Sequence, residues 1–213
     1  MAGDARDTRR EYGFGALRRA MLAQSPHDQF AAWMDAAVQA QLRDTTAMAL
    51  ATASGAGKPG VRIVLLKHFD ANGYCWYTDL GSHKAADLSD NLQAELLFYW
   101  REFDRQIRIS RTVERLADAE VDAYFTSRPL ASKLSAAASS QSSTIEDRAA
   151  LEAEYDRIER QHPDGDVPRP ERWGGFRLVA ETFEFWQGRK GRLHDRFRYA
   201  IADQDWQIER LQP

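Results

Sequence analysis

The stretch RQIRISRTVERL, residues 105–116, alternates between two kinds of side chain. One parity holds Ile107, Ile109, Arg111 and Val113, and the other holds Arg108, Ser110, Thr112 and Glu114. Successive side chains of a β-strand point to opposite faces, so this pattern predicts a strand with one mainly apolar face and not a helix of period 3.6. The same period of two recurs along the chain and therefore decides the fold class.

Runs of similar character predict further strands on both sides of this segment. We place them at about 47–54, 61–69, 74–78, 95–100, 175–187, 192–201 and 205–211. Asn72-Gly73, between two of them, is typical of a tight turn. Apolar residues at helical spacing predict helices at about 28–43, 82–91, 118–127 and 144–161. Strands joined by short turns, with only a few helices, predict an α+β fold that is mainly β: an antiparallel barrel with helices packed outside it.

Composition indicates an ordinary globular protein. The 213 residues are 43% apolar and 29% charged, with a formal net charge of -3, so we expect no nucleic-acid partner. The single cysteine, Cys75, the charged first residues and the lack of an apolar run of about 18 residues predict a cytoplasmic protein without a membrane partner. We predict an N-terminal arm over residues 1–26 and a single domain over 27–213.

The stretch RLHDRFRY, residues 192–199, carries basic side chains at a period of two. They are Arg192, His194, Arg196 and Arg198. On a strand all of them would project from one face, about 7 Å apart, where like charges destabilise a sheet unless an anion lies between them. In a mildly acidic chain this predicts a local anion site.

RIVLLK, residues 62–67, places Arg62 and Lys67 at the two ends of an apolar strand. An ideal strand would put these two side chains on opposite faces. The segment is typical both of two solvated cations at strand ends and of a pair that binds phosphate.

YFTSRPLAS, residues 124–132, places Tyr124, Arg128 and Ser132 four residues apart, as on one helix face. A guanidinium between two hydroxyls suits a phosphate dianion, because arginine binds it in a planar, bidentate way; an exposed helix end is the alternative. SSQSS, residues 139–143, is either a flexible linker or a loop that binds a ligand. Two phosphate-type clusters beside one basic strand predict two phosphorylated ligands that meet end to end.

The order of these motifs resembles that of the pyridoxine/pyridoxamine 5'-phosphate oxidase family. The segments that carry the resemblance, over about residues 9–213, are RREY, RIVLLKHFD, YTDLGSHKA, LLFYW, RQIRI, YFTSRP, QSS, WGGFRL, FWQG and RLHDRFRY. The resemblance implies a split β-barrel of the FMN-binding type, in a homodimer with FMN at the subunit interface. It also implies oxidation of pyridoxamine 5'-phosphate or pyridoxine 5'-phosphate to pyridoxal 5'-phosphate, with dioxygen as acceptor and hydrogen peroxide as product.

The resemblance further implies roles for particular residues. The FMN-binding set is Arg62, Ile63, Val64, Leu65, Leu66, Lys67, Tyr77, Thr78, His83, Lys84, Gln106, Gln141, Ser142, Trp186 and Arg196. The substrate-binding set is Arg9, Tyr12, Lys67, Tyr124, Arg128, Ser132, Arg192 and His194. Arg192 and His194 are the catalytic pair at the reacting carbon, and the N-terminal arm closes over the site as a lid. No residue is assigned to a metal.

Two positions depart from the family pattern. His83 stands where the family usually has arginine, and the lost charge-assisted bond to the FMN phosphate costs about 1.5–3 kcal/mol. Ser135, Ala136 and Ala137 stand where the family commonly has Gly-Ala-Trp, which removes an indole from the pocket wall. These changes keep two alternatives open: a barrel that binds FMN or pyridoxal phosphate without turnover, and an FMN-dependent reductase with another substrate. The complete substrate-binding set favours the oxidase.

Overall fold

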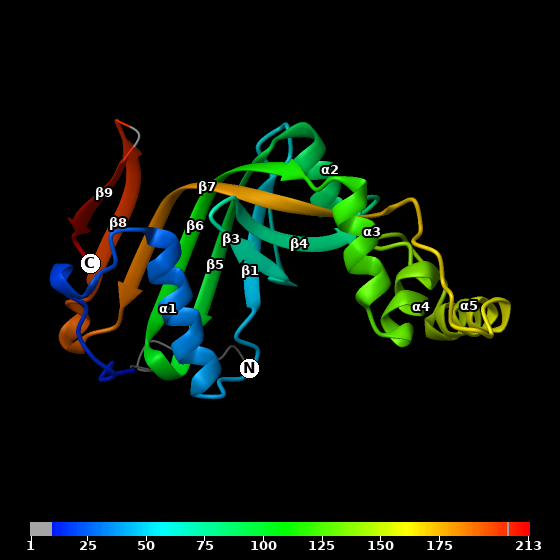
Figure 1. The fold of residues 1–213 in the computed structure, drawn as a ribbon, viewed down its shortest axis with the longest axis horizontal. Coiled ribbons are helices and arrows are strands. Elements are labelled where there is room, and N and C mark those ends of the chain that lie inside the picture. Colours follow the sequence, from blue (N-terminus) through cyan, green and yellow to red (C-terminus); the bar gives the residue numbers. More distant parts are fainter. Residues whose placement is uncertain (1–9, 204) are drawn as a thin grey trace, which may run out of the picture. The chain divides into compact units, whose positions relative to one another are not determined.

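Nine β-strands pair into one sheet in the computed structural model, which describes residues 10–203 and 205–213 (Figure 1). They are β1 (Ala47–Ala53), β2 (Pro59–Leu65), β3 (His68–Asp70), β4 (Gly73–Asp79), β5 (Gln93–Trp100), β6 (Arg105–Arg115), β7 (Trp173–Gln187), β8 (Asp195–Ala202) and β9 (Asp205–Leu211). Their order is β2-β1-β5-β6-β7-β4-β3, and β8 pairs with β7 and β9. The pairs β3–β4, β4–β7, β7–β8 and β8–β9 are antiparallel.

Five α-helices accompany the sheet in the described part of the chain. They are α1 (Pro26–Gln39), α2 (His83–Asp90), α3 (Asp118–Ser127), α4 (Leu130–Ala138) and α5 (Arg148–Gln161). The predicted class, α+β and mainly β, is confirmed. The helix α4 was not among the predicted helices, because its last residues begin the Ser/Ala-rich stretch 135–144, which is typical of a loop. None of the helices in the two described ranges is long and apolar enough to cross a membrane.

The alternation predicted for residues 105–116 holds in β6 for the apolar side chains, whereas Arg111 of the same parity is exposed. Ile107, Ile109 and Val113 are completely buried, and Arg108 and Glu114 are exposed, as the period of two predicts. The apolar parity therefore faces the core of the protein, as expected for a strand with one apolar face.

The turn between β3 and β4 differs by one residue from the prediction. Asp70 pairs with Gly73, so the turn residues are Ala71 and Asn72, and Gly73 is the first residue of β4. The Asp70 carboxylate accepts hydrogen bonds from the backbone N–H groups of Asn72 (2.8 Å) and Gly73 (3.2 Å). A Cβ at Gly73 would lie 2.3 Å from the carbonyl oxygen of Leu178, so only glycine fits where β4 meets β7.

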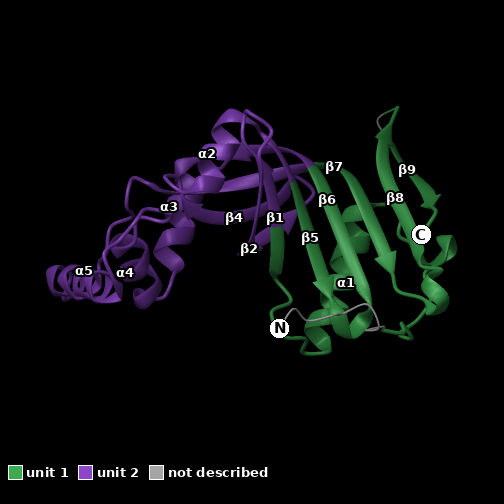
Figure 2. Cartoon of the chain, turned by 180° about the vertical axis from the view of Figure 1, so that it is seen from behind, with its two compact units in different colours: residues 1–49, 95–110, 180–213 green, residues 50–94, 111–179 purple. Residues whose placement is uncertain are grey.

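Segments distant in sequence combine into two compact units (Figure 2). Unit 1 comprises residues 1–49, 95–110 and 180–213, of which the structure describes those from residue 10 onward except 204. Unit 2 comprises residues 50–94 and 111–179. The strand β7 contributes to both: its first half pairs with β4 in unit 2, and its second half pairs with β8 in unit 1.

Aromatic side chains of α1 and the sheet build the core of unit 1. The ring of Phe30 meets that of Phe98 with 5.1 Å between centroids, and Trp33 meets Phe185 at 5.3 Å. All four residues are at most 5% exposed. The helix α1 therefore buries the apolar face that its sequence predicts.

Two apolar clusters stabilise unit 2. The larger cluster includes Cys75 of β4, Phe125 of α3 and Trp173 of β7, with Tyr77 and Tyr124 packed against it. A second cluster, Leu134, Ile158 and Val167, joins α4 to α5. Ala137 packs against this second cluster.

The basic stretch 192–199 corrects a prediction. Strand β8 begins at Asp195, so Arg192 and His194 precede it and do not share its face. Arg192 ends a 3-10 turn (Lys190–Arg192) with φ of 61°, next to Gly191 with φ of 63°. Two consecutive residues in the left-handed region interrupt extended structure, which a count of parity does not reveal.

The anions beside the two arginines of β8 are carboxylates of neighbouring strands. The Arg196 guanidinium donates to both oxygens of Glu184 at 2.9 and 3.0 Å. Arg198 donates to Glu209 of β9. The positive charges of Arg196 and Arg198 are therefore paired with carboxylates of the protein itself.

Candidate functional site

A cavity of about 810 Å³ lies in unit 2 and gathers most of the predicted cofactor residues. Those that line it are Arg62, Ile63, Val64, Leu65, Lys67, Tyr77, Thr78, His83, Lys84, Gln141 and Ser142, together with the predicted substrate residue Arg128. The sequence assigned no role to three other residues of its lining, which are Val61, Asp79 and Trp173, and Ser139 of the SSQSS stretch lines it too. Ser135 and Ala136 also line it.

Lys84, in the first turn of α2, contributes a buried ammonium group to this cavity. Its Nζ donates to Thr78 Oγ1 (3.0 Å), Ser82 Oγ (3.1 Å) and Gln141 Oε1 (2.5 Å). Burial, and then the charge of Arg62, lowers the pKa of Lys84 to about 8. The acceptors in these bonds are neutral, so the ammonium keeps its charge available for an anion.

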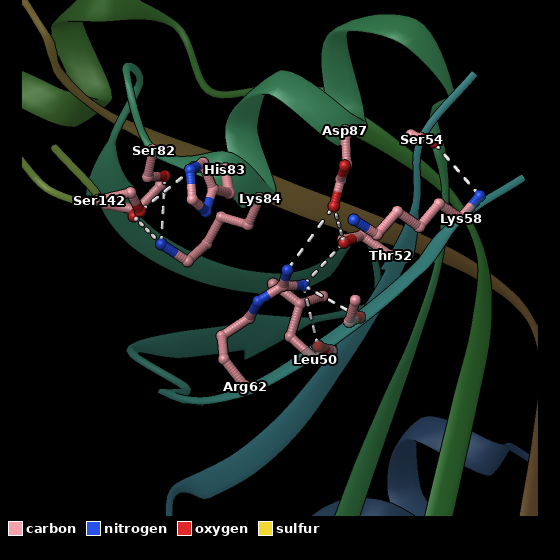
Figure 3. Close-up of polar contacts among 12 residues, drawn as sticks. Leu50, Thr52, Ser54, Lys58, Arg62, Ser82, His83, Lys84, Asp87 and Ser142 are labelled. Carbon is pink, nitrogen blue, oxygen red and sulfur yellow. Dashed lines mark hydrogen bonds and ion pairs between the residues drawn. The ribbon is translucent and has the colours of Figure 1, made fainter. Parts of the chain in front are cut away.

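Arg62, on β2, is held by neighbours on β1 and α2 (Figure 3). Its Nη1 donates to Thr52 Oγ1 (2.7 Å) and to the carbonyl oxygen of Leu50 (3.2 Å). Its Nη2 lies 3.6 Å from a carboxylate oxygen of Asp87 on α2, which also accepts from Thr52 Oγ1. Asp87 and Thr52 thus fix Arg62 at the cavity wall, a role that the sequence pattern did not reveal.

The N-terminus of α2 points a backbone donor toward the loop that carries Ser142. Ser82 is the N-cap residue, but its Oγ donates to the carbonyl oxygen of Asp79 (2.7 Å) and makes no capping bond. The backbone N–H of His83 donates to Ser142 Oγ at 3.3 Å, which Figure 3 shows. The start of a helix favours anions, because its first N–H groups carry a partial positive charge.

The loop that carries Gln141 is tied to β4 by an ion pair. Arg172 donates to an Asp79 carboxylate oxygen at 2.9 Å and to the carbonyl oxygens of Ala137 (3.0 Å) and Ser139 (2.7 Å). The same Asp79 oxygen accepts from the backbone N–H of Gln141 at 3.2 Å. Asp79 and Arg172 therefore order a stretch that the sequence left open as a linker, and they support the interpretation as a ligand-binding loop.

Arg128 lines another part of the cavity, among aromatic rings. Its guanidinium carbon lies 4.8 Å from the ring centroid of Trp173. Its Nη1 is buried and has no hydrogen-bond partner among the described residues. The ring of Tyr124 stacks on that of Tyr77 with 4.0 Å between centroids. A buried guanidinium donor without a partner is costly unless a ligand accepts from it.

Arg62 and Lys67 both line the cavity despite their opposite parity. β2 ends at Leu65, so Lys67 lies beyond the strand and is free of its alternation. The backbone N–H of Lys67 donates to the carbonyl oxygen of Cys75 at 2.9 Å. Leu66 does not line the cavity and is buried, with 4% of its surface exposed.

The other predicted residues in the described chain do not line this cavity. Ser132 is half-buried on α4, outside the lining of the cavity. Gln106, Trp186 and Arg196 belong to unit 1. Arg9 lies outside the described residues. Ala137, where we expected an opening of the pocket wall, packs toward α5 and does not line the cavity.

Unit 1 brings together Tyr12, Trp186 and His194. The Tyr12 ring makes edge contacts with Trp186 (5.5 Å between centroids) and His194 (5.1 Å). The backbone N–H of Arg189 donates to Nδ1 of His194 at 3.1 Å. Burial, and then the charge of Arg192, lowers the pKa of His194, which favours the neutral imidazole. Because Nδ1 accepts a hydrogen bond, the neutral ring carries its proton on Nε2.

The chemistry of the cavity fits a phosphorylated ligand. Its lining includes four cations, Arg62, Lys67, Lys84 and Arg128, and hydroxyl groups of threonine, serine and tyrosine. Its carboxylate, Asp79, is engaged by Arg172. Within the described ranges, no group of histidine, cysteine and acidic residues is arranged to hold a metal ion.

Comparison with known proteins adds family information. The family model described as pyridoxamine 5'-phosphate oxidase matches residues 34–162. The model described as the pyridoxine 5'-phosphate oxidase C-terminal dimerisation region matches residues 173–213. A pyridoxine/pyridoxamine 5'-phosphate oxidase of Aliivibrio fischeri is 48% identical over 207 residues, which are 97% of this chain and 98% of that protein. One of Photobacterium profundum is 47% identical over 210 residues, 99% of this chain and 100% of that protein.

Solved structures agree on the fold. PhzG from Burkholderia lata, solved with tetrahydrophenazine-1-carboxylic acid, is 33% identical with a TM-score of 0.85, and the match covers 90% of this chain and 94% of PhzG. A pyridoxamine 5'-phosphate oxidase-related, FMN-binding protein of Nostoc punctiforme is 19% identical with a TM-score of 0.72, over 90% of this chain and 100% of that one. These similarities confirm the predicted split-barrel fold.

Proposed function

Because the chain belongs to the pyridoxamine 5'-phosphate oxidase family, we propose that it oxidises pyridoxamine 5'-phosphate and pyridoxine 5'-phosphate to pyridoxal 5'-phosphate, with FMN as cofactor. Dioxygen is the acceptor and hydrogen peroxide the product. The observation that carries the proposal is the cationic cavity of unit 2, where the buried Nη1 of Arg128 has no partner among the described residues. The substrate and the cofactor are both phosphate esters, as two phosphate-type clusters require.

The cofactor end of the cavity is the start of α2. The ammonium of Lys84, the guanidinium of Arg62 and the N-terminal dipole of α2 would hold the FMN phosphate. Gln141 and Thr78 fix Lys84 there. FMN, when bound, supplies the two-electron acceptor, so the protein has to provide position and charge.

The substrate end is the aromatic wall beside Arg128. Arg128, Lys67, Tyr124 and Ser132 would anchor the vitamer phosphate and so hold the reacting carbon in place, which is catalysis by orientation. Arg192 and His194 act on the amine or alcohol end. Since Nδ1 of His194 already accepts from a backbone N–H, the imidazole presents its Nε2–H to the substrate as a donor.

The proposed assembly is a homodimer with FMN at the subunit interface. Residues 173–213 match the family's dimerisation region. The strand β2, at one end of the sheet order, exposes Val61 (71%), Ile63 (67%) and Leu65 (45%), and all three line the cavity. A row of exposed apolar side chains beside a ligand cavity suits a protein partner. A cytoplasmic location remains a prediction from the sequence.

The test of function starts with the purified protein. We expect a yellow protein that, when given pyridoxamine 5'-phosphate in air, forms equal amounts of aldehyde and peroxide. Yellow protein without either product would instead support the non-catalytic binder. Turnover of another substrate with a reduced nicotinamide, and none of the vitamer, would support the reductase.

Replacing His83 with arginine is expected to tighten FMN binding about tenfold. The side chain lies at the first residue of α2 and lines the cavity, and a guanidinium there adds a charge-assisted bond of about 1.5 kcal/mol, the lower end of the range because His83 is exposed. Titration of the apoprotein with FMN, followed by flavin fluorescence, measures the Kd. His68→Arg, an exposed histidine on β3 outside the cavity lining, is the matched control. An unchanged Kd in His83→Arg would show that the side chain at residue 83 does not contact the FMN phosphate.

FMN binding is expected to weaken about tenfold between pH 7 and pH 9. Lys84 has a pKa of about 8, lowered by burial, so it binds the anion as an ammonium at pH 7 and has lost its proton in most molecules at pH 9. The Kd therefore rises as the pH passes through 8. In Lys84→Met the Kd should be higher at pH 7 and nearly constant over this interval. If the Kd for FMN of Lys84→Met rose equally steeply between pH 7 and pH 9, the pH dependence would come from a group other than Lys84.

A further inference from the structure

Residues 10–17 of the N-terminal arm are fixed on unit 1 by a buried carboxylate. Asp104 is 4% exposed, and both of its oxygens accept hydrogen bonds from the arm. Oδ1 accepts from the Arg10 guanidinium at 2.5 Å. Oδ2 accepts from the backbone N–H groups of Gly13 (3.0 Å) and Phe14 (3.3 Å). These two backbone donors belong to the two residues that follow Tyr12. Asp104 therefore fixes the path of the chain next to Tyr12.

Asp104 is itself held by backbone hydrogen bonds. It follows the 3-10 turn Arg101–Phe103 in the left-handed region, with φ of 51° and ψ of 39°. Its carbonyl oxygen accepts from the backbone N–H of Gly188 at 2.7 Å and from Nε2 of Gln187 at 3.3 Å. The carboxylate that holds the arm is thereby tied to the turn after Trp186.

These hydrogen bonds determine where the side chain of Tyr12 packs. Its ring contacts Trp186 and His194. A Cβ at Gly188 would lie 2.5 Å from Cδ1 of Tyr12 and 2.9 Å from Cβ of Asp104, so a side chain there requires the Tyr12 ring or Asp104 to shift. Arm and turn also line a second cavity of about 370 Å³, whose wall includes Tyr12, Arg189 and Lys190.

We propose that Asp104 is a positioning residue that docks the arm and sets Tyr12 against His194 for the substrate. The role of Tyr12 and His194 toward the substrate rests on the proposed function, whereas the docking rests on the contacts above. A carboxylate suits this task because both oxygens are acceptors, one for the Arg10 guanidinium and one for two backbone N–H groups. Asparagine has the same shape, but its amide keeps only one acceptor oxygen and directs an NH2 donor toward one of these partners.

The first test compares Asp104→Asn with Glu102→Gln, a neighbouring exposed carboxylate in the 3-10 turn. Asparagine tolerates the left-handed conformation of residue 104, so the backbone is kept. We expect trypsin to cleave the arm at Arg10 at least tenfold faster in Asp104→Asn, with the control equal to the wild type. Equal cleavage in all three proteins would overturn the proposal, whether or not the protein oxidises the vitamer.

The second test asks whether Asp104 acts through Tyr12. We expect Asp104→Asn to raise KM for pyridoxamine 5'-phosphate about 10- to 100-fold with an unchanged Kd for FMN. In the Tyr12→Ala background the same substitution should have no further effect, because the positioned ring is gone. Additive losses, or a loss of FMN binding equal to that of activity, would contradict a positioning role.

Gly188→Ala keeps the proposal testable if Asp104→Asn folds poorly. This variant keeps the Asp104 side chain, and the nearest atoms that its added methyl group meets are two ring atoms of Tyr12 and Cβ of Asp104. We expect faster cleavage of the arm and a higher KM in this variant too. A wild-type rate of cleavage would overturn the proposal. If the wild type oxidises no vitamer while cleavage responds as expected, the docking role of Asp104 is supported and the proposed function is the part that fails.

Discussion

Arg192→Leu is expected to lower the turnover of pyridoxamine 5'-phosphate about 10²- to 10⁴-fold, while the FMN content of the purified protein stays that of the wild type. Arg192 is exposed at the end of the turn before β8, and burial, followed by the charge of Arg192, lowers the pKa of His194. It is not among the described residues that line the cofactor cavity of unit 2. The loss should therefore fall on the chemical step. Steady-state peroxide formation and the flavin absorbance of the same samples measure the two quantities.

Two further variants separate this effect from a structural one. Arg198→Leu removes an exposed arginine of the same stretch, whose partner is Glu209, and should keep turnover within about twofold because surface ion pairs contribute little. Arg192→Asn tolerates the left-handed φ of 61° better than leucine and should lose turnover equally. Parallel losses of flavin and turnover in both Arg192 variants would count against a role at the substrate.

The strands could be predicted from the sequence because the apolar residues of a buried face recur at every second position within one segment. Ile107, Ile109 and Val113 show this in β6, and no distant residue is needed to interpret them. The start of β8 was misplaced because a period of two continues through Arg192 and His194, although the backbone there turns at Gly191. Local parity gives no information about a backbone that leaves the extended region.

The basic stretch 192–199 predicted that its cations need nearby anions, and the structure shows carboxylates of neighbouring strands beside Arg196 and Arg198. Glu184 and Glu209 satisfy Arg196 and Arg198 in the sheet. They lie 12 and 11 positions away in sequence, on β7 and β9, so strand pairing brings them there. Charge spacing within one segment cannot show which residues the neighbouring strands contribute.

The same limit explains which site residues the sequence revealed. Lys84 and Arg128 carry charges in motifs that resemble the family's, and the structure places both at the cavity. Asp79, Arg172 and Asp87 act through pairs formed between distant segments, such as the Asp79–Arg172 bond. No spacing in the sequence predicts such a pair, because the fold alone brings its members together.

Arg128→Met is expected to raise KM for pyridoxamine 5'-phosphate about 10- to 100-fold, with a smaller change in kcat at saturation. Arg128 stacks over Trp173 and has a buried Nη1 without a partner in the described chain, so a ligand phosphate is the acceptor that this donor lacks. Methionine keeps much of the apolar contact and removes the charge. Lys133→Met, a cation nearby on α4 that does not line the cavity, is the matched control and should keep KM.

The decisive measurement is discrimination between pyridoxamine 5'-phosphate and pyridoxamine. If Arg128 binds the ester, its removal lowers kcat/KM for the phosphorylated amine and leaves the low value for the free amine nearly unchanged, so the ratio falls about 10- to 100-fold. Arg128→Lys should restore only part of the ratio, because an ammonium cannot form the planar, bidentate contact or stack on Trp173 as a guanidinium does. An unchanged ratio of the two kcat/KM values in Arg128→Met would show that other residues bind the phosphate. The buried Nη1 of Arg128 would then have no ligand acceptor.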